Sequence, residues 1–285
     1  MEALPYIRSF HGKTVVVKYG GAAMRVAALR ETVAADIILM HYVGMRPVVV
    51  HGGGPEVTSL MARLGKEASF VDGLRVTDAE SAELVEMVLV GKVNRELVTL
   101  LNRQGGRAVG LSGKDGNTIL ARRMVYVDRE GVRRDLGHVG EVAGVDPSLL
   151  LTLTRTGYIP VLSPVAAGDH EETLNCNADA VAGEVAAALG AEKLVVLTDV
   201  EGIREEPGNP ESVLSSLAVD RAERLIAAGT IRGGMIPKVR ACARALSGGV
   251  NRAHIVDGRI PHALLLEVFT RKGIGTMVEA GEAGK

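Results

Sequence analysis

The sequence predicts an α/β fold in which a mostly parallel sheet is covered by helices on both faces. Two observations lead to this class. Short runs rich in β-branched residues alternate along the chain with longer helical stretches, which is the order expected of strand–helix–strand units. The strand runs are also continuously apolar, and this is typical of strands that are buried on both faces.

Six strands are expected from these runs, in chain order 14–18, 47–51, 108–111, 159–162, 193–198 and 253–256. Helices are expected at 26–42, 56–64, 78–104, 179–189, 219–228, 237–247 and 262–270. In an open parallel sheet, binding loops lie beyond the carboxyl ends of the strands. Lys18, the glycines at 52–54 and Asp199 all lie at such ends, so we expect the functional site along that edge.

Three segments interrupt this alternation. Residues 120–145 alternate in polarity around a turn at 128–131 and are expected to form an antiparallel hairpin. The polar stretch 165–173 is expected to be a loop between two lobes, which we place at 1–170 and 171–285. Residues 205–212 contain Pro207, Gly208 and Pro210 and are expected to form a surface loop.

Composition and charge exclude several classes of protein. Of the 285 residues, 47% are hydrophobic and 24% are charged, with a formal net charge of −1, as in an ordinary globular protein. There is no basic surplus for nucleic acid, no apolar run near the roughly 20 residues that span a bilayer, and no signal-peptide pattern. We therefore expect a cytoplasmic protein without nucleic-acid or membrane partners, in which Cys176 and Cys242 are reduced.

Two lysines lie next to glycines in a way that suits phosphate binding. Lys18 ends an apolar run and precedes Gly20 and Gly21, and Lys238 ends the segment Gly-Gly-Met-Ile-Pro-Lys at 233–238. A phosphoryl group in transfer spreads negative charge over its oxygens, so its site needs cations and free backbone N–H groups. Each lysine alone could be solvated, but a lysine near a helix N-terminus opposes the helix dipole unless an anion lies nearby.

The glycines at 52–54 follow a predicted strand and precede a predicted helix. Gly53 and Gly54 would let the backbone approach a ligand, and the helix N-terminus favours anions; a tight turn is the alternative. The run is not a dinucleotide fingerprint, because Val57 occupies the position of the third glycine. The nearest match to a Walker loop fails too, with Ala108 and Asp115 at required positions.

The segment Asn-Cys-Asn-Ala-Asp at 175–179 precedes an alanine-rich helix. Helix capping is the simple interpretation, but Asn175, Asn177 and Asp179 together exceed what one cap requires. Asp179 could orient the two lysines through charge-assisted hydrogen bonds. Cys176 is interpreted as a small packed residue.

Arg75 lies just before a predicted helix and has the side chain suited to a two-pronged grip on a carboxylate. An exposed ion pair is the alternative interpretation. His51 is interpreted as a packed or hydrogen-bonded residue at a strand end. The seven histidines show no metal-ligand spacing, so no protein metal site is expected.

Seven segments in order resemble those of the amino acid kinase family, and within it the acetylglutamate kinases. They lie at 18–21, 51–55, 73–77, 86–92, 175–179, 197–202 and 233–238. The resemblance implies an open three-layer αβα sandwich with two lobes. The N-terminal lobe would bind N-acetyl-L-glutamate and dimerise, and the C-terminal lobe would bind ATP, with Mg²⁺ held mainly by the nucleotide phosphates.

The same resemblance implies roles for the residues singled out above. Lys18 and Lys238 would stabilise the transferring phosphoryl group, and Asp179 would organise them. The proposed contacts to substrate and phosphate are the backbone of Gly53 and Gly54, Arg75 on a carboxylate, Asn175 near the α-substituent, and Gly20 and Gly21 along the phosphate path.

A second resemblance, to the arginine site of feedback-inhibited family members, lies near the C-terminus. It rests on His254, Glu267 and Gly273, and it implies L-arginine as an inhibitor. Without it, His254 would be a strand residue and Glu267 part of a solvated helix face. These relatives join dimers into hexamers through an N-terminal helix, and 4–7 resembles only its end. We therefore expect a homo-oligomer, either a dimer or a hexamer.

The leading hypothesis is therefore ATP-dependent phosphorylation of N-acetyl-L-glutamate in arginine biosynthesis. Two alternatives stay open. One is a sister kinase with another acidic amino acid, a carbamate or a nucleotide as its substrate, although Arg75 and Asn175 in their motifs favour the acetylated amino acid. The other is an arginine-sensing binding protein without catalysis.

Overall fold

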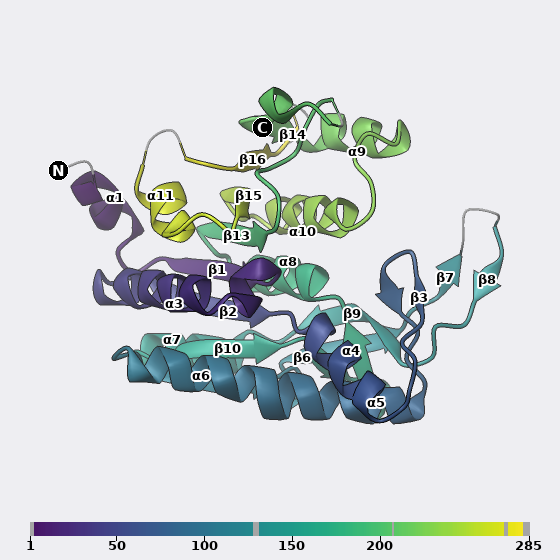
Figure 1. Cartoon of the computed structure of the whole chain (residues 1–285). Coiled ribbons are helices and arrows are strands. Elements are labelled where there is room, and N and C mark those ends of the chain that lie inside the picture. Colours follow the sequence, from purple (N-terminus) through teal and green to yellow (C-terminus); the bar gives the residue numbers. More distant parts are fainter. Residues whose placement is uncertain (1–2, 128–130, 207, 271–272, 282–285) are drawn as a thin grey trace.

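A computed structural model describes residues 3–127, 131–206, 208–270 and 273–281, and its central feature is an eight-stranded sheet (Figure 1). From edge to edge the strands are β14 (Ser216–Ala218), β16 (Thr276–Glu279), β15 (Arg252–Asp257), β13 (Lys193–Thr198), β1 (Thr14–Tyr19), β2 (Arg46–His51), β10 (Ile159–Ser163) and β5 (Ala108–Ser112). Neighbouring strands run parallel except β15 and β16, which are antiparallel. This confirms the predicted fold class.

Helices cover both faces of this sheet. The near layer in Figure 1 contains α3 (Ala27–Tyr42), α6 (Asn94–Arg103) and α11 (Ala263–Phe269), and the far layer contains α8 (Ala178–Ala188) and α10 (Met235–Ser247). Residues of β1 alternate between the two cores, because Val15 and Val17 pack with the first layer and Val16 with the second. β1 is thus apolar on both sides, which explains its continuous run of valines.

The remaining helices are α1 (Ala3–Phe10), α2 (Ala22–Arg25), α4 (Gly54–Arg63), α5 (Ala79–Glu86), α7 (Ser148–Arg155) and α9 (Val219–Ala227). The helix predicted at 78–104 consists of α5, a π-helical segment η1 (Met87–Val93) and α6 in direct succession. The sequence interpretation missed α1, α2 and α7, and it also missed the strands β14 and β16 of the central sheet. Among the described residues, no helix has the length and apolar character needed to cross a bilayer.

A small closed barrel lies beside the sheet and consists of β6 (Ile119–Arg123), β9 (Val139–Val145), β11 (Val165–Ala167) and β12 (Thr173–Cys176). The predicted hairpin over 120–145 is confirmed, since β6 and β9 pair antiparallel. The predicted loop at 165–173 is wrong at both ends, because β11 and β12 pair with each other and with β6 and β9.

Two short hairpins project from this part of the molecule (Figure 1). One pairs β3 (Phe70–Val71) with β4 (Leu74–Arg75), and the other pairs β7 (Tyr126–Val127) with β8 (Arg133–Arg134). Most of the turn predicted at 128–131 lies outside the described residues, as does Pro207 of the predicted surface loop.

The sheet register places the predicted functional segments side by side. Lys18 of β1 lies opposite Val50 of β2 and Val196 of β13. The glycines after β1, the glycines after β2 and Asp199 after β13 therefore lie at one edge of the sheet. This is the edge at which an open parallel sheet carries its binding loops.

Candidate functional site

One carboxylate joins the two lysines that are far apart in the sequence. Lys18 Nζ lies 3.0 Å from Oδ1 of Asp179, and Lys238 Nζ lies 2.8 Å from Oδ2 of the same residue. Lys18 lies one residue before the end of the buried strand β1, Asp179 lies in the first turn of α8, and Lys238 lies in the first turn of α10. The structure therefore brings all three predicted residues together.

The three charges are largely removed from water, since Lys18 is 7% and Asp179 5% exposed. Burial lowers the pKa of Lys18, which Asp179 opposes and Lys238 reinforces. Burial raises the pKa of Asp179, but the two lysines outweigh it and leave that pKa below its ordinary value. The carboxylate is thus held ionised between two cations, an arrangement with one positive charge in excess.

Gly20 and Gly21 lie against charged side chains. A Cβ on Gly20 would stand 2.5 Å from the Lys18 Nζ, so any side chain there would displace the ammonium. A Cβ on Gly21 would overlap with the carboxylate of Asp199, which accepts a hydrogen bond from the N–H of Ala22. Gly21 also has a φ of 70°, in the left-handed region that favours glycine.

The turn after β2 lies next to the one after β1. The N–H of Gly52 donates to the carbonyl of Tyr19 at 2.8 Å. Gly53 has a φ of 154°, and a Cβ there would stand 2.5 Å from Cδ2 of Leu89. Gly54 begins α4, and a Cβ there would meet no atom within 4 Å. The two glycine segments thus border one region beside Lys18.

Arg75 is buried at 7% exposure, so its interpretation as an exposed ion pair is wrong. Its Nη2 donates to the Gly54 carbonyl at 2.9 Å and to Thr58 Oγ1 at 2.7 Å, and its guanidinium lies over the ring of Phe70. Burial lowers the pKa of Arg75. Among the described residues no carboxylate pairs with Arg75, which leaves its charge available for an anion.

Asn175 lies on β12, three residues before α8 begins and on the same segment as Asp179. Its Nδ2 lies 3.5 Å from Oγ1 of the buried Thr77. Asn177 forms the helix cap by accepting hydrogen bonds from two backbone N–H groups. Capping therefore accounts for Asn177 alone. The side chains of Asn175 and Asp179 take no part in the cap.

The residues of the predicted arginine site also meet. His254 Nδ1 lies 2.5 Å from Oε1 of Glu267, whose Oε2 accepts the N–H groups of Ile274 and Gly275. A Cβ on Gly273 would stand 2.8 Å from that Oε2. Glu267 is 4% exposed, so its interpretation as part of a solvated helix face is wrong.

Burial lowers the pKa of His254, and Glu267 opposes this shift. The pKa of Glu267 is raised by burial, but His254 and backbone N–H groups bring it below its ordinary value. Next to this pair is Lys193, which the sequence interpretation missed. It is 3% exposed, and burial lowers its pKa to about 8.

The burial of His51 and Cys176 tests how each was interpreted from the sequence. His51 is fully buried and Cys176 is 4% exposed, which confirms both as packed residues. Burial raises the pKa of the Cys176 thiol to about 12. Within the described residues, no group of three or more His, Cys, Asp or Glu side chains is placed to hold a metal ion.

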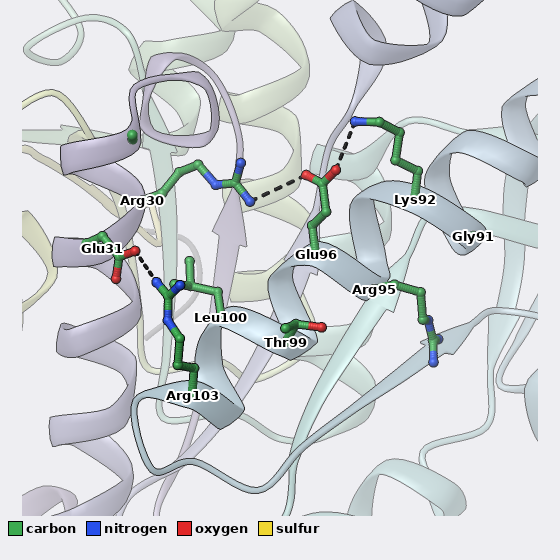
Figure 2. A pocket seen from close by; sticks show the side chains of 10 residues that line it. Arg30, Glu31, Gly91, Lys92, Arg95, Glu96, Thr99, Leu100 and Arg103 are labelled. Atoms are coloured by element: carbon green, nitrogen blue, oxygen red, sulfur yellow. Dashed lines mark hydrogen bonds and ion pairs between the residues drawn. The ribbon is translucent and has the colours of Figure 1, made fainter.

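Figure 2 shows a groove of about 620 Å³ between α3 and the helix that η1 and α6 form. Arg30 points to Glu96 at 3.4 Å, Lys92 approaches Glu96 from the other side, and Arg103 pairs with Glu31. Arg95 points away from these pairs. Apart from Arg95, which donates to Asn94 Oδ1, the charges in the groove pair with one another, and none of its lining residues belongs to the lysine–aspartate cluster.

The chain is similar to known proteins over nearly its whole length. A model of the amino acid kinase family matches residues 13–257. The acetylglutamate kinase of Moorella thermoacetica is 57% identical over 284 residues, which cover 99% of this chain and 96% of that protein. That of Symbiobacterium thermophilum is 59% identical over 278 residues, covering 97% and 95%.

Solved structures give a similar result. N-acetylglutamate synthase from Neisseria gonorrhoeae, complexed with coenzyme A and N-acetyl-glutamate, superposes with a TM-score of 0.83 at 31% identity. The match covers 97% of this chain, which spans only 62% of the synthase. The same synthase complexed with coenzyme A and L-arginine gives a TM-score of 0.79 at 30% identity, covering 97% of this chain and 63% of the synthase.

Proposed function

Because the chain belongs to the amino acid kinase family, we propose that it is an acetylglutamate kinase, which phosphorylates N-acetyl-L-glutamate in arginine biosynthesis. The reaction transfers the γ-phosphoryl group of ATP to the side-chain carboxylate, giving N-acetylglutamyl 5-phosphate and ADP. The observation that carries this proposal is the contact of Lys18 and Lys238 with the single carboxylate of Asp179. It supports a site built for phosphoryl groups.

The attacking group needs no general base in this reaction. A carboxylate with an ordinary pKa of about 4.3 is already ionised at neutral pH. The difficulty is the repulsion between two anions, which the enzyme must hold together while charge spreads over the transferring group. Lys18 and Lys238 supply the cations for this step. Asp179 orients both ammonium groups, and its negative charge offsets one of their two positive charges.

The substrate side of the site is proposed to consist of four groups around the second glycine turn. The guanidinium of Arg75 is fixed to the Gly54 carbonyl and to Thr58 through Nη2, and to Met61 Sδ through Nη1. The N–H of Nε and the second N–H of Nη1 remain for a substrate carboxylate. Asn175 would bind near the acetamido group. The backbone of Gly53 and Gly54 would contact the anionic end, where their lack of side chains admits close approach.

ATP would reach the same site from the other lobe, and Gly20 and Gly21 would line the path of its phosphates. A side chain on Gly20 would displace the Lys18 ammonium, which fits a place where phosphate and lysine meet. Mg²⁺ would be bound by the nucleotide phosphates, where it adds positive charge. We assign acetylglutamate to the lobe at 1–170 and ATP to the lobe at 171–285.

L-Arginine is the proposed inhibitor. Its guanidinium would pair with Glu267, which already lies against His254 and a segment that includes Gly273. The arginine complex of the similar synthase supports this choice of ligand. We further propose a homo-oligomer, dimer or hexamer, and a cytoplasmic location, where ATP is available and the buried Cys176 and Cys242 stay reduced.

A panel of acceptors tests the function directly. ADP release would be coupled to a visible reaction and measured with N-acetyl-L-glutamate, L-glutamate, L-aspartate and carbamate. Acetylglutamate should give the highest kcat/KM. Faster reaction with free glutamate or aspartate would overturn the choice of substrate, and no turnover with any acceptor would favour a non-catalytic arginine-binding protein.

A further inference from the structure

A chain of buried hydrogen bonds connects the glycine turn after β2 with the start of α6. His51 Nδ1 lies 2.7 Å from the carbonyl oxygen of Gly52, and His51 Nε2 lies 3.1 Å from Nδ2 of Asn94. His51 and Asn94 are both fully buried. A carbonyl can only accept, so Nδ1 carries the proton, and Nε2 accepts from the amide of Asn94.

The orientation of the Asn94 amide is fixed by its other contacts. Its Nδ2 also donates to the carbonyl of Val161 at 2.8 Å and lies 3.4 Å from that of Leu111. Its Oδ1 accepts from Nη2 of Arg95 at 2.9 Å. A flipped amide would set its oxygen against two carbonyl oxygens, so Asn94 can present only a donor to His51.

The bond from His51 fixes the direction of the next peptide group. In a planar trans peptide, the carbonyl of Gly52 and the N–H of Gly53 point in opposite directions. A carbonyl held inward by His51 therefore turns the Gly53 N–H outward. That N–H donates to no group among the described residues. Three successive glycines would otherwise let this peptide rotate easily.

The π-helical segment η1 closes the other side of the same turn. Leu89 and Val93 of η1 would lie 2.5 Å and 3.3 Å from a Cβ on Gly53, and Asn94 follows η1 directly. Such segments are rare in helices and often lie at functional sites. Here η1 sets two apolar side chains against Gly53 while Asn94 reaches His51.

We propose that His51 is a positioning residue, which acts through the Gly52 carbonyl to aim the Gly53 N–H at the anionic end of the substrate, with Asn94 holding its ring. This role rests on the proposed function, because Gly53 is there assigned to the acceptor. His51 itself touches no reacting atom. It supplies the rigidity that the three glycines lack.

Two substitutions of His51 separate this role from simple packing. In His51→Asn the amide nitrogen takes the place of Nδ1 and keeps a donor for Gly52, but the bond to Asn94 is lost. In His51→Gln the amide reaches the place of Nε2 and keeps the bond to Asn94, but the donor for Gly52 is lost. Each variant therefore removes one buried hydrogen bond and keeps the other.

We expect His51→Gln to lower kcat/KM for acetylglutamate by about tenfold or more, and His51→Asn to lower it by about threefold at most. The KM for ATP should change by less than about twofold in both variants. Thermal midpoints should fall by similar amounts, since each variant loses one buried bond. Equal kinetic losses, or a larger loss in His51→Asn, would overturn the positioning role.

Nitrogen NMR of the labelled parent protein gives an independent test. The two ring nitrogens of a neutral histidine differ in chemical shift according to which one carries the proton. A protonated Nδ1 in His51 is the expected result, and a protonated Nε2 would overturn the proposal. If the parent enzyme fails to phosphorylate acetylglutamate, the proposed function falls, while this measurement still decides the arrangement of His51.

Discussion

Lys238 Nζ lies 2.8 Å from Oδ2 of Asp179, although the two residues are 59 positions apart in the chain. The other oxygen of that carboxylate lies 3.0 Å from Lys18 Nζ. One acidic side chain thus sets the direction of two cations that come from a strand and a helix.

Asp179→Asn should lower kcat by about 100-fold while the fold persists. The neutral amide no longer opposes the effects of burial and of Lys238, which both lower the pKa of Lys18. Lys18 then loses its proton more readily, so the activity of the variant should fall faster than that of the parent as pH rises. Measurement of kcat from neutral to alkaline pH checks this. Parallel profiles would contradict an electrostatic role for Asp179.

Gly20→Ala should reduce kcat by about tenfold or more with little loss of stability. The added methyl group meets the far end of the flexible Lys18 side chain, which can move at small cost but then leaves its position by Asp179. Gly144→Ala is the matched control, because a Cβ there meets no atom within 4 Å. Kinetics and thermal unfolding of both variants would be compared. If Gly20→Ala kept the activity of the parent, the position of the Lys18 ammonium would not matter for catalysis.

The stability of the protein should depend on the ionisation of His51. Burial lowers the pKa of His51 to about 4 from an ordinary value of 6.5; the hydrogen bond to Gly52 opposes this shift, and Arg95 adds a smaller lowering. As pH falls below about 6.5, the unfolded chain takes up this proton first, so stability is lost down to about pH 4 and no further below it. The gap corresponds to roughly 3 kcal/mol.

His51→Asn lacks this titration and serves as the comparison. Urea unfolding of both proteins at about pH 7 and pH 4 should show the parent losing up to about 3 kcal/mol more than the variant. If the difference between the two proteins stays constant with pH, His51 is not a buried neutral group. This measurement concerns the folded state and does not depend on catalysis.

Glu267→Gln should raise the arginine concentration for half-inhibition by about tenfold or more, because the amide cannot form a charged pair with a guanidinium. Its near-identical shape preserves the packing of the buried side chain. Glu184→Gln is the control, since Glu184 pairs with Arg244 at the surface. Activity would be titrated with arginine in all three proteins. An unchanged value in Glu267→Gln would reject the site, and a parent insensitive to saturating arginine would reject inhibition itself.

Much of the fold could be predicted because its sheet is buried on both faces. The runs at 14–18 and 193–198 are continuously apolar, and the observed strands start where predicted and differ by one residue at most at their ends. The short strands β11 and β12 could not be predicted, because three or four residues carry little periodicity and their partners lie far away in sequence. α1 and α7, each of eight residues, are too short to give a clear pattern.

The candidate site, like the fold, could be predicted only in part. The sequence pattern predicted that Lys18, Asp179 and Lys238 lie at element ends, but only the tertiary structure brings both lysines within 3.0 Å of the Asp179 carboxylate. The π-helical segment at Met87–Val93 was predicted as part of an ordinary helix, because its apolar residues fit the helical pattern on either side of it and only the structure shows that Leu89 and Val93 lie against Gly53. Asn94 was also missed, although a polar residue among buried leucines and valines is a detectable signal.

The most direct test of the central claim is the turnover of Lys18→Ala, Lys238→Ala and the double variant with acetylglutamate and ATP. If the two ammonium groups act on one phosphoryl group, each single substitution should lower kcat by at least about 100-fold, and the double variant should lose much less than the product of the two. Thermal unfolding would verify that all three proteins fold. Single variants with rates near that of the parent would contradict the claim.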